Sequence, residues 1–291
     1  MKILISAANG KTGRHIIAAL QARSEAPLIR GLDVTPVAME GVEGVVGDMT
    51  DPAVLAEVVD GIDAIIHYGP PMHPRETAMG TGMIDAASAA GVRRFVFVSV
   101  IHPQIDDLMN HRSKLAIEAH LINSALDWTV LRPQHYMQNV DVKRALGEGR
   151  LVMPYPVSTV LGHVDMRDLA EAAAKVVMEA GHTYATYDIS ADAPLSVSDI
   201  CTVISAASGK PIEAIAIDPS ALVEIIRQHW PEPLSDYSVD AFHRLFGYYA
   251  RHGIRGNPNV LTWLLGRAPG TFDTYVADSI SGVVGKVGNP G

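Results

Sequence analysis

Cysteine is nearly absent from this sequence, because only Cys201 among its 291 residues carries a thiol. A single cysteine excludes an intramolecular disulfide and fits a reducing compartment. The chain also lacks an apolar run of about 18 residues, the length that a membrane-spanning helix needs. The first predicted strand begins next to the N-terminus, which leaves no room for a signal peptide. We therefore expect a cytoplasmic protein without a membrane partner.

Positive charge is scarce as well. The chain has 23 Lys and Arg against 32 Asp and Glu, and its net charge is −9 with histidine counted as neutral. The basic residues form no cluster, so the composition excludes nucleic-acid binding through the phosphate backbone.

Several catalytic and metal-binding patterns are also missing. No two histidines stand two, three or four residues apart, so no local metal pair is expected. Neither a G-x-S-x-G elbow nor a G-x-x-x-x-G-K-[ST] loop occurs. These absences leave an α/β protein with a large core as the best interpretation, since hydrophobic residues make up 48% of the chain.

The first twenty residues, MKILISAANGKTGRHIIAAL, contain the most informative pattern. An apolar run predicts a buried strand over 3–5, small residues predict a turn, and 15–20 reads as a helix. Ala7, Gly10 and Gly13 are spaced as G-x-x-G-x-x-G with alanine at the first position. A strand, a small-residue turn and a helix together predict a dinucleotide pocket, in which the helix N-terminus holds the pyrophosphate. The alternative is an ordinary tight turn.

A predicted second strand, 27–33, ends in Asp33, twenty residues after Gly13. A carboxylate at this place accepts hydrogen bonds from the adenosine ribose and repels a 2′-phosphate, so it favours NAD(H) over NADP(H). Lys11 and Arg14 lie beside the turn and keep NADP(H) open. The alternative reading of Asp33 is a turn residue before Thr35.

Further elements alternate along the chain. Strands are predicted at 42–46, 64–67, 93–100 and 128–131, with helices at 77–90 and 111–124 between them. This alternation predicts a doubly wound parallel sheet. Helices follow at 167–180, 220–229 and 236–252. We divide the chain into a dinucleotide-binding domain (1–150) and a smaller, mostly helical lobe (151–291), part of which returns to the first domain, and we expect 283–291 to be a frayed tail.

The joint order of these motifs resembles the NmrA-like atypical short-chain dehydrogenase/reductases. The resemblance covers nearly the whole chain and rests on ILISAANGKTG, GDMTDPAVL, GIDAIIH, AASAAGVRRFVFVS, RSKLAIEAHL and DWTVLRPQHYMQN, with YYARHGIRGNPNVLTWLLGR near the end. It implies a Rossmann domain, a substrate cleft under the C-terminal lobe and no metal.

The resemblance also implies roles for single residues. Gly10 and Gly13 would contact the pyrophosphate, and Asp33 the ribose. Asp48 would lie near the adenine, Ser99 beside the nicotinamide and Lys114 on the nicotinamide ribose. The full set of predicted cofactor contacts is Ala7, Asn9, Gly10, Lys11, Thr12, Gly13, Asp33, Asp48, Met49, Tyr68, Ser99, Lys114 and Pro133.

Two departures from the family pattern stand out. Ala7 replaces the first glycine, which is tolerable if its φ is negative. The Y-x-x-x-K motif is absent, because Asn110 stands four residues before Lys114. An amide does not supply a proton usefully, so the proton donor must be sought elsewhere.

Besides Lys114, two residues are predicted to be catalytic, and both are candidate proton donors. His111 lies three residues before Lys114, and its unperturbed pKa of about 6.5 suits proton exchange near neutrality. Tyr136 follows the strand at 128–131 and would need a lowered pKa, for which Lys114 is a candidate cause. His111 could instead be a surface residue and Tyr136 a core aromatic. We expect His102, Tyr136 and Tyr248 to contact substrate.

The sequence thus predicts an NAD(P)(H)-dependent oxidoreductase that acts on a small, uncharged organic substrate, with NAD(H) favoured. The alternative, suggested by the missing tyrosine, is an NmrA-like redox sensor that binds the cofactor without turnover. A homodimer is compatible with either.

Overall fold

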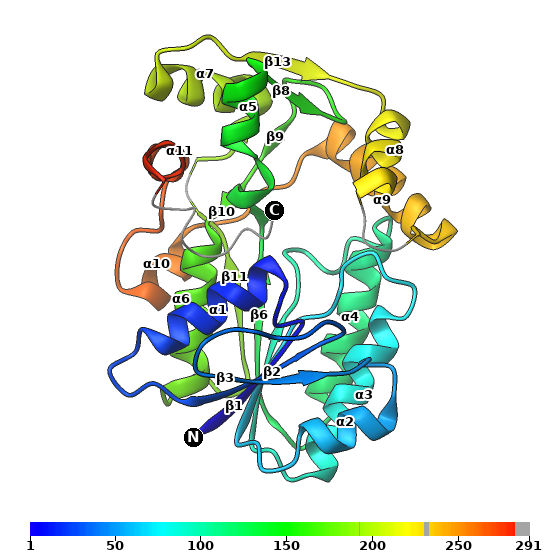
Figure 1. Cartoon of the computed structure of the whole chain (residues 1–291). Helices are drawn as coiled ribbons and strands as arrows, with labels where there is room; N and C mark the ends of the chain where they lie inside the picture. Colours follow the sequence, from blue (N-terminus) through cyan, green and yellow to red (C-terminus); the bar gives the residue numbers. More distant parts are fainter. Residues whose placement is uncertain (192, 230–232, 283–291) are drawn as a thin grey trace.

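A seven-stranded parallel sheet forms the lower half of the molecule in the computed structural model, which describes residues 1–191, 193–229 and 233–282 (Figure 1). The tail expected at 283–291 lies outside these residues. The strands are β1 (Lys2–Ser6), β2 (Leu28–Asp33), β3 (Val42–Val46), β4 (Ala64–His67), β5 (Arg94–Val98), β6 (Asp127–Pro133) and β11 (Ala185–Ile189). Their order is β11-β6-β5-β4-β1-β2-β3, so the predicted doubly wound sheet is confirmed. The strand order reverses between β1 and β4, where such sheets bind ligands.

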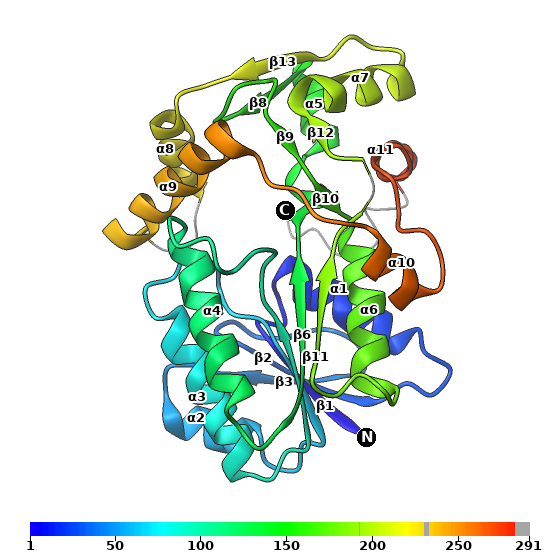
Figure 2. The ribbon, with the colours of Figure 1, turned by 180° about the vertical axis from the view of Figure 1, so that it is seen from behind.

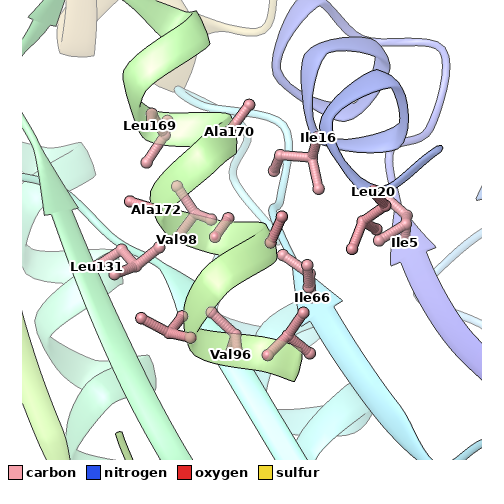
Figure 3. Close-up of a cluster of buried hydrophobic side chains, with 14 of the residues drawn as sticks. Ile5, Ile16, Leu20, Ile66, Val96, Val98, Leu131, Leu169, Ala170 and Ala172 are labelled. Atoms are coloured by element: carbon pink, nitrogen blue, oxygen red, sulfur yellow. The ribbon is translucent and has the colours of Figure 1, made fainter. Parts of the chain in front are cut away.

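Helices cover both faces of this sheet (Figures 1 and 2). One face carries α1 (Lys11–Gln21), α6 (Met166–Met178) and α10 (Asn259–Leu265), and the other carries α2 (Pro52–Val58), α3 (Glu76–Ala89) and α4 (Met109–Ile122). Each face of the sheet has its own hydrophobic core, and successive residues of a strand point to opposite faces. Ile5 therefore packs towards α1 and α6, while Leu4 packs towards α2 and α3. Figure 3 shows the first core, in which Ile16 of α1 faces Ala170 of α6 and Leu20 of α1 lies beside Ile5 of β1.

The remaining elements form a second lobe above the carboxyl ends of the strands, which we call the cap lobe (Figure 1). It contains α5 (Val142–Glu148), β8 (Arg150–Met153), β9 (Val160–Leu161), β12 (Leu195–Ser196), α7 (Val197–Ser208), β13 (Glu213–Ala216), α8 (Pro219–His229), α9 (Asp236–His252) and α11 (Phe272–Ser281). The short β7 (His135–Tyr136), η1 (Met137–Asn139) and β10 (His163–Val164) connect it to the sheet. The cap lobe has its own hydrophobic core. Ser196 and Asp199 close a capping box at the start of α7.

The chain passes between the two lobes more than once. Helices α6 and α10 and strand β11 come from the second half of the sequence but pack on the sheet. The sequence did not predict β11, because ATYDI is a short and partly polar edge strand. Helix α5 precedes residue 151 but packs in the cap lobe. The division at residue 150 stays a prediction. Among the helices of the described residues, none is long and apolar enough to cross a membrane.

Candidate functional site

The turn between β1 and α1 lies at the point where the strand order reverses. Ala7 has a φ of +48°, so the negative φ under which alanine would be tolerated easily is not observed, and the turn holds a non-glycine residue in the left-handed region. A Cβ added to Gly13 would lie 2.5 Å from the carbonyl oxygen of Ala7. Only glycine therefore lets α1 approach the turn this closely. Gly10 is the N-cap of α1, whose first turn has no side-chain cap. The amides there are available to an anion.

The turn is tied to the loop after β2 through Asp33. The backbone N–H of Asn9 donates to Asp33 Oδ2 at 3.0 Å, and the N–H and hydroxyl of Thr35 donate to Oδ1 at 3.1 and 3.0 Å. Arg14 Nε donates to the carbonyl of Asn9 at 2.8 Å, and Lys11 is exposed beside it. Asp33 thus makes the contacts expected of a turn residue, which was the alternative interpretation. It also brings a carboxylate to the predicted ribose position.

Asp48 and Met49 follow β3. Asp48 accepts a hydrogen bond from the N–H of Thr50 at 2.8 Å, which is the main reason that its pKa is lowered. Arg75 lies 3.5 Å from the same carboxylate. Met49 is buried in the core under α2 and α3. The predicted contacts of Asp48 with the adenine and of Met49 with the cofactor remain predictions.

A cavity of about 410 Å³ lies between the carboxyl ends of the strands and the cap lobe. The sheet contributes Tyr68 after β4, Ser99 after β5 and Pro133 at the end of β6, while α4 contributes Asn110 and Lys114. The cap-lobe wall is apolar and aromatic, and consists mainly of Met153, Tyr155, Leu222, Ile226, Phe242, Leu245, Phe246, Tyr249 and Ile254. Four predicted cofactor contacts therefore line one cavity together with Tyr136, the predicted substrate contact.

The glycine turn and the cavity are neighbours. Thr12, in the first turn of α1, interacts through its side chain with both Tyr68 and Tyr136. A ligand that begins at the start of α1 and extends past Thr12 would therefore reach the cavity. This is the path expected of a dinucleotide bound at the strand ends.

Lys114 forms a buried ion pair that the sequence did not predict. Its Nζ lies 2.7 Å from Oε1 of Glu76, and the two side chains are 4% and 1% exposed. The rings of Tyr68 and Phe97 lie 5.3 and 5.7 Å from the ammonium. Burial by itself would lower the pKa of Lys114, but Glu76, Tyr68 and Glu118 together outweigh burial, and the pKa is raised. Glu76 gives a weak sequence signal, as an acid at the start of an otherwise small and apolar helix.

Ser99 belongs to a second buried polar network. Its hydroxyl donates to Glu118 Oε1 at 2.5 Å, and Arg132 holds both oxygens of Glu118 at 3.1 and 2.6 Å. Glu118 stands one helical turn after Lys114, so the spacing on α4 contained this signal. The network fixes the wall of the cavity at the end of β5.

His111 differs from its expected chemistry. The ring is fully buried, and its Nδ1 lies 2.9 Å from the carbonyl oxygen of His102. Burial lowers the pKa of His111 to about 4, so the expectation of a group titrating near neutrality is wrong. His111 is not among the residues that line the cavity. The Nε2 of His102 contacts the carbonyl of Arg255 at 2.6 Å, so His102 connects the loop after β5 to the chain after α9 and also lies outside the cavity lining.

The two predicted tyrosines have different outcomes. Tyr136 lines the cavity, but burial raises its pKa well above the usual range, so the lowered pKa that we expected is wrong. Tyr248 packs against His252, with ring centroids 4.7 Å apart, and is not part of the lining. Its neighbour Tyr249 lines the cavity instead. The helical pattern identified the correct turn of α9 but the wrong residue in it.

Two buried amides in the cavity wall have unused hydrogen-bonding groups. Asn110 and Gln134 are 7% and 4% exposed. Within residues 1–191, 193–229 and 233–282, Asn110 Oδ1 and both polar atoms of the Gln134 amide lack a hydrogen-bond partner. The same described part of the chain contains no group of three metal-ligating side chains. These neutral amides therefore line the cavity together with the charged Lys114.

The reversed strand order, the glycine turn and the cavity above the strand ends define a protein of the Rossmann dinucleotide-binding class. The sequence matches the NmrA-like family over residues 1–261, and the chain belongs to that family, as its motifs suggested.

Its relatives include NAD(P)H-dependent reductases. The chain is 26% identical to the NAD(P)H azoreductase of Xenophilus azovorans over 281 residues, which cover 94% of this chain and 96% of that one. The fold is similar to that of the NADPH-dependent quinone oxidoreductase of Escherichia coli in complex with NADPH, with a TM-score of 0.77, 22% identity and coverage of 97% and 99%. It is also similar to a short-chain dehydrogenase/reductase superfamily protein from Agrobacterium tumefaciens with bound NAD, with a TM-score of 0.67, 18% identity and coverage of 98% and 99%.

Proposed function

We propose that this protein is an NAD(P)H-dependent reductase of a small, uncharged organic acceptor with a flat apolar body. The observation that carries the proposal is the cavity of about 410 Å³, whose wall formed by the sheet and α4 contains four predicted cofactor contacts and whose cap wall is apolar. A cavity of this size encloses a ligand of one or two rings. The azoreductase relative acts in the same broad class.

The residues of the turn fit a dinucleotide. Gly13 leaves the space that a Cβ would fill, and the first turn of α1 is uncapped. When bound, the cofactor supplies the hydride. The protein's part is to orient both reactants, with Lys114 and Ser99 at the end nearest the cavity and the apolar cap wall excluding water from it.

We propose NAD(H) as the preferred form. Asp33 brings a carboxylate to the end of β2, where it would repel a 2′-phosphate. The fold occurs with either form, since solved structures similar to this chain are described with NADPH and with NAD. The preference therefore depends on local charge, in which Asp33 opposes Arg14 and Lys11.

The cavity wall also favours a conjugated acceptor. Burial raises the pKa of Tyr136 and lowers the pKa of His135 to about 4, so neither is a good acid at neutral pH. Conjugated carbonyl compounds can be reduced without a nearby acid, because the negative charge of their reduced form is spread over several atoms. A simple ketone would produce a localised, strongly basic oxygen anion.

The test is a fluorescence titration with NADH and NADPH, followed by turnover with a quinone, an azo dye and a simple ketone. We expect saturable binding, tighter for NADH, and turnover of the conjugated acceptors only. Asp33→Asn should shift the preference towards NADPH. Failure of both cofactors to bind at millimolar concentration would refute the proposal. Binding without turnover of any acceptor, together with a cofactor-dependent change of shape, would favour the redox-sensor alternative.

A further inference from the structure

Asn110 is a buried amide whose side chain makes no hydrogen bond within the described residues. It is 7% exposed and lies on the first turn of α4, in the cavity wall. Within the described residues its Oδ1, an acceptor, is buried without a partner, and its Nδ2, the donor that could serve a ligand in the cavity, makes no hydrogen bond. Unpartnered buried amides are unfavourable, so a group of this kind that faces a cavity calls for a ligand.

Lys114 is a polar neighbour of Asn110 on the same helix. The two residues are four apart, which stacks them on one face of α4, and both line the cavity. One Nζ–H of Lys114 is directed to Glu76, at 2.7 Å, and the ammonium has two further donors. The Glu76 carboxylate balances the charge of Lys114 in the resting protein. This cavity therefore offers a neutral amide donor and an ammonium from the same face of α4.

We propose that Asn110 and Lys114 form an anion-stabilising pair that holds the oxygen of the acceptor as it becomes negatively charged. An acceptor that gains a hydride forms a new C–H bond, breaks a π bond and moves that electron pair onto its conjugated oxygen. The Nδ2–H of Asn110 and an Nζ–H of Lys114 donate to this oxygen. Solvent water then supplies the proton as the product leaves, and hydroxide remains.

This role of Asn110 rests on the proposed function. It adds the requirement that the acceptor develops negative charge on an oxygen. Donors fixed in place before the reaction stabilise a developing anion without reorganisation, and loss of one such donor costs about 10²–10³ in rate in other enzymes. The pair replaces a proton donor with hydrogen-bond donors. It therefore selects acceptors whose reduced oxygen remains anionic at neutral pH for the lifetime of the complex.

The experiment uses 4-nitrophenol and the protein without cofactor, because the absorbance of the phenolate reports the charge on the bound oxygen. We expect the bound phenol to ionise at a lower pH than the free phenol. Asn110→Leu, which keeps the branching of the side chain, should abolish most of this shift. It should also raise the melting temperature, because it removes an unpartnered buried amide. Reduction of a quinone should fall at least 100-fold in the same variant, mainly in kcat.

The matched control is Asn123→Leu on the same helix. Asn123 is exposed at the end of α4, where its Nδ2 donates to the carbonyl of Ala119 at 2.8 Å. This variant should keep the phenolate shift. Asn110→Ser, a smaller change, provides a second folded variant if Asn110→Leu does not fold, and it should also lose most of the shift.

The outcomes separate this inference from the proposed function. An undiminished shift in Asn110→Leu or Asn110→Ser, or no shift in the parent protein, would overturn the role of Asn110. A parent protein that shifts the phenol but neither binds a dinucleotide nor reduces any acceptor would instead overturn the proposed function.

Discussion

At the scale of single residues, the Lys114–Glu76 pair brings two opposite charges together in a buried place beside the cavity. Both side chains are almost fully buried, and no solvent screens them. Breaking such a pair by removing one partner costs much more than removing both, because the remaining charge stays buried. Glu76 thus stabilises the charged form of the buried Lys114 side chain.

This gives a test by a double-mutant cycle. Glu76→Gln should lower the free energy of unfolding by about 3–5 kcal/mol, since Lys114 is left unpaired. Lys114→Met combined with Glu76→Gln should recover most of that loss while dinucleotide affinity stays low. Urea unfolding of the four proteins measures the coupling. Strictly additive losses would mean that the two groups do not interact.

Residue spacing on α4 explains what the sequence could and could not predict about the site. Lys114, Ser99, Tyr68 and Tyr136 were predicted, and all four line one cavity. Spacing alone did not show that the cavity lies on the Asn110 side of the helix rather than on the His111 side. The direction in which a helix faces is decided by its packing, which a local pattern does not contain.

At the scale of elements, the β1–α1 connection depends on one atom that Gly13 lacks. A Cβ there would lie 2.5 Å from Ala7 O and 2.9 Å from Ala8 Cα, both of which are backbone atoms that yield little. Helix α1 would have to move away from the turn, and its packing on α6 would move with it (Figure 3).

Gly13→Ala should therefore lower the free energy of unfolding by about 1–3 kcal/mol and weaken dinucleotide binding. Gly147 in α5 is the matched control, because a Cβ there meets nothing within 4 Å. Gly147→Ala should raise stability by about 0.5–1 kcal/mol and leave binding unchanged. Thermal unfolding and NADH titration measure both. Equal effects of the two substitutions would show that the close approach at Gly13 is unimportant.

The elements themselves were largely predictable. The strand at Val42–Val46 and the helix at Asp236–His252 have the predicted bounds, because apolar periodicity and capping residues are local signals. The two-residue strands β7, β9, β10 and β12 and the edge strand β11 were not predicted. Their pairing partners lie far away in the chain, so no local pattern indicates them.

At the scale of the whole molecule, buried neutral histidines link stability to pH. Burial lowers the pKa of His67 and His163 to about 3 and of His111 and His135 to about 4. In the unfolded chain each has a pKa of about 6.5, so the unfolded state binds more protons as the pH falls from 6.5. Their contribution is fully present above pH 6.5 and is lost progressively below it.

Between pH 6.5 and 5, each of these histidines should lower the free energy of unfolding by up to about 1.4 kcal/mol per pH unit. Carboxylates contribute little in this range, because they stay mostly ionised in both states. Urea unfolding at half-unit intervals measures the slope. His163→Leu should reduce the slope by the share of one histidine, and a flat profile from pH 7 to 5 would contradict the burial of these rings as neutral groups.

The return of α6, β11 and α10 to the sheet has a consequence for biosynthesis. A ribosome releases the chain from the N-terminus, so β6 leaves the exit tunnel before its neighbour β11 has been made. Until then, Val96, Val98 and Leu131 lack the helix that covers them in the finished molecule. The nascent sheet exposes this apolar face while about 45 further residues, from the end of β6 to the end of α6, are translated. We expect chaperones to bind the exposed apolar face of the nascent sheet during this period.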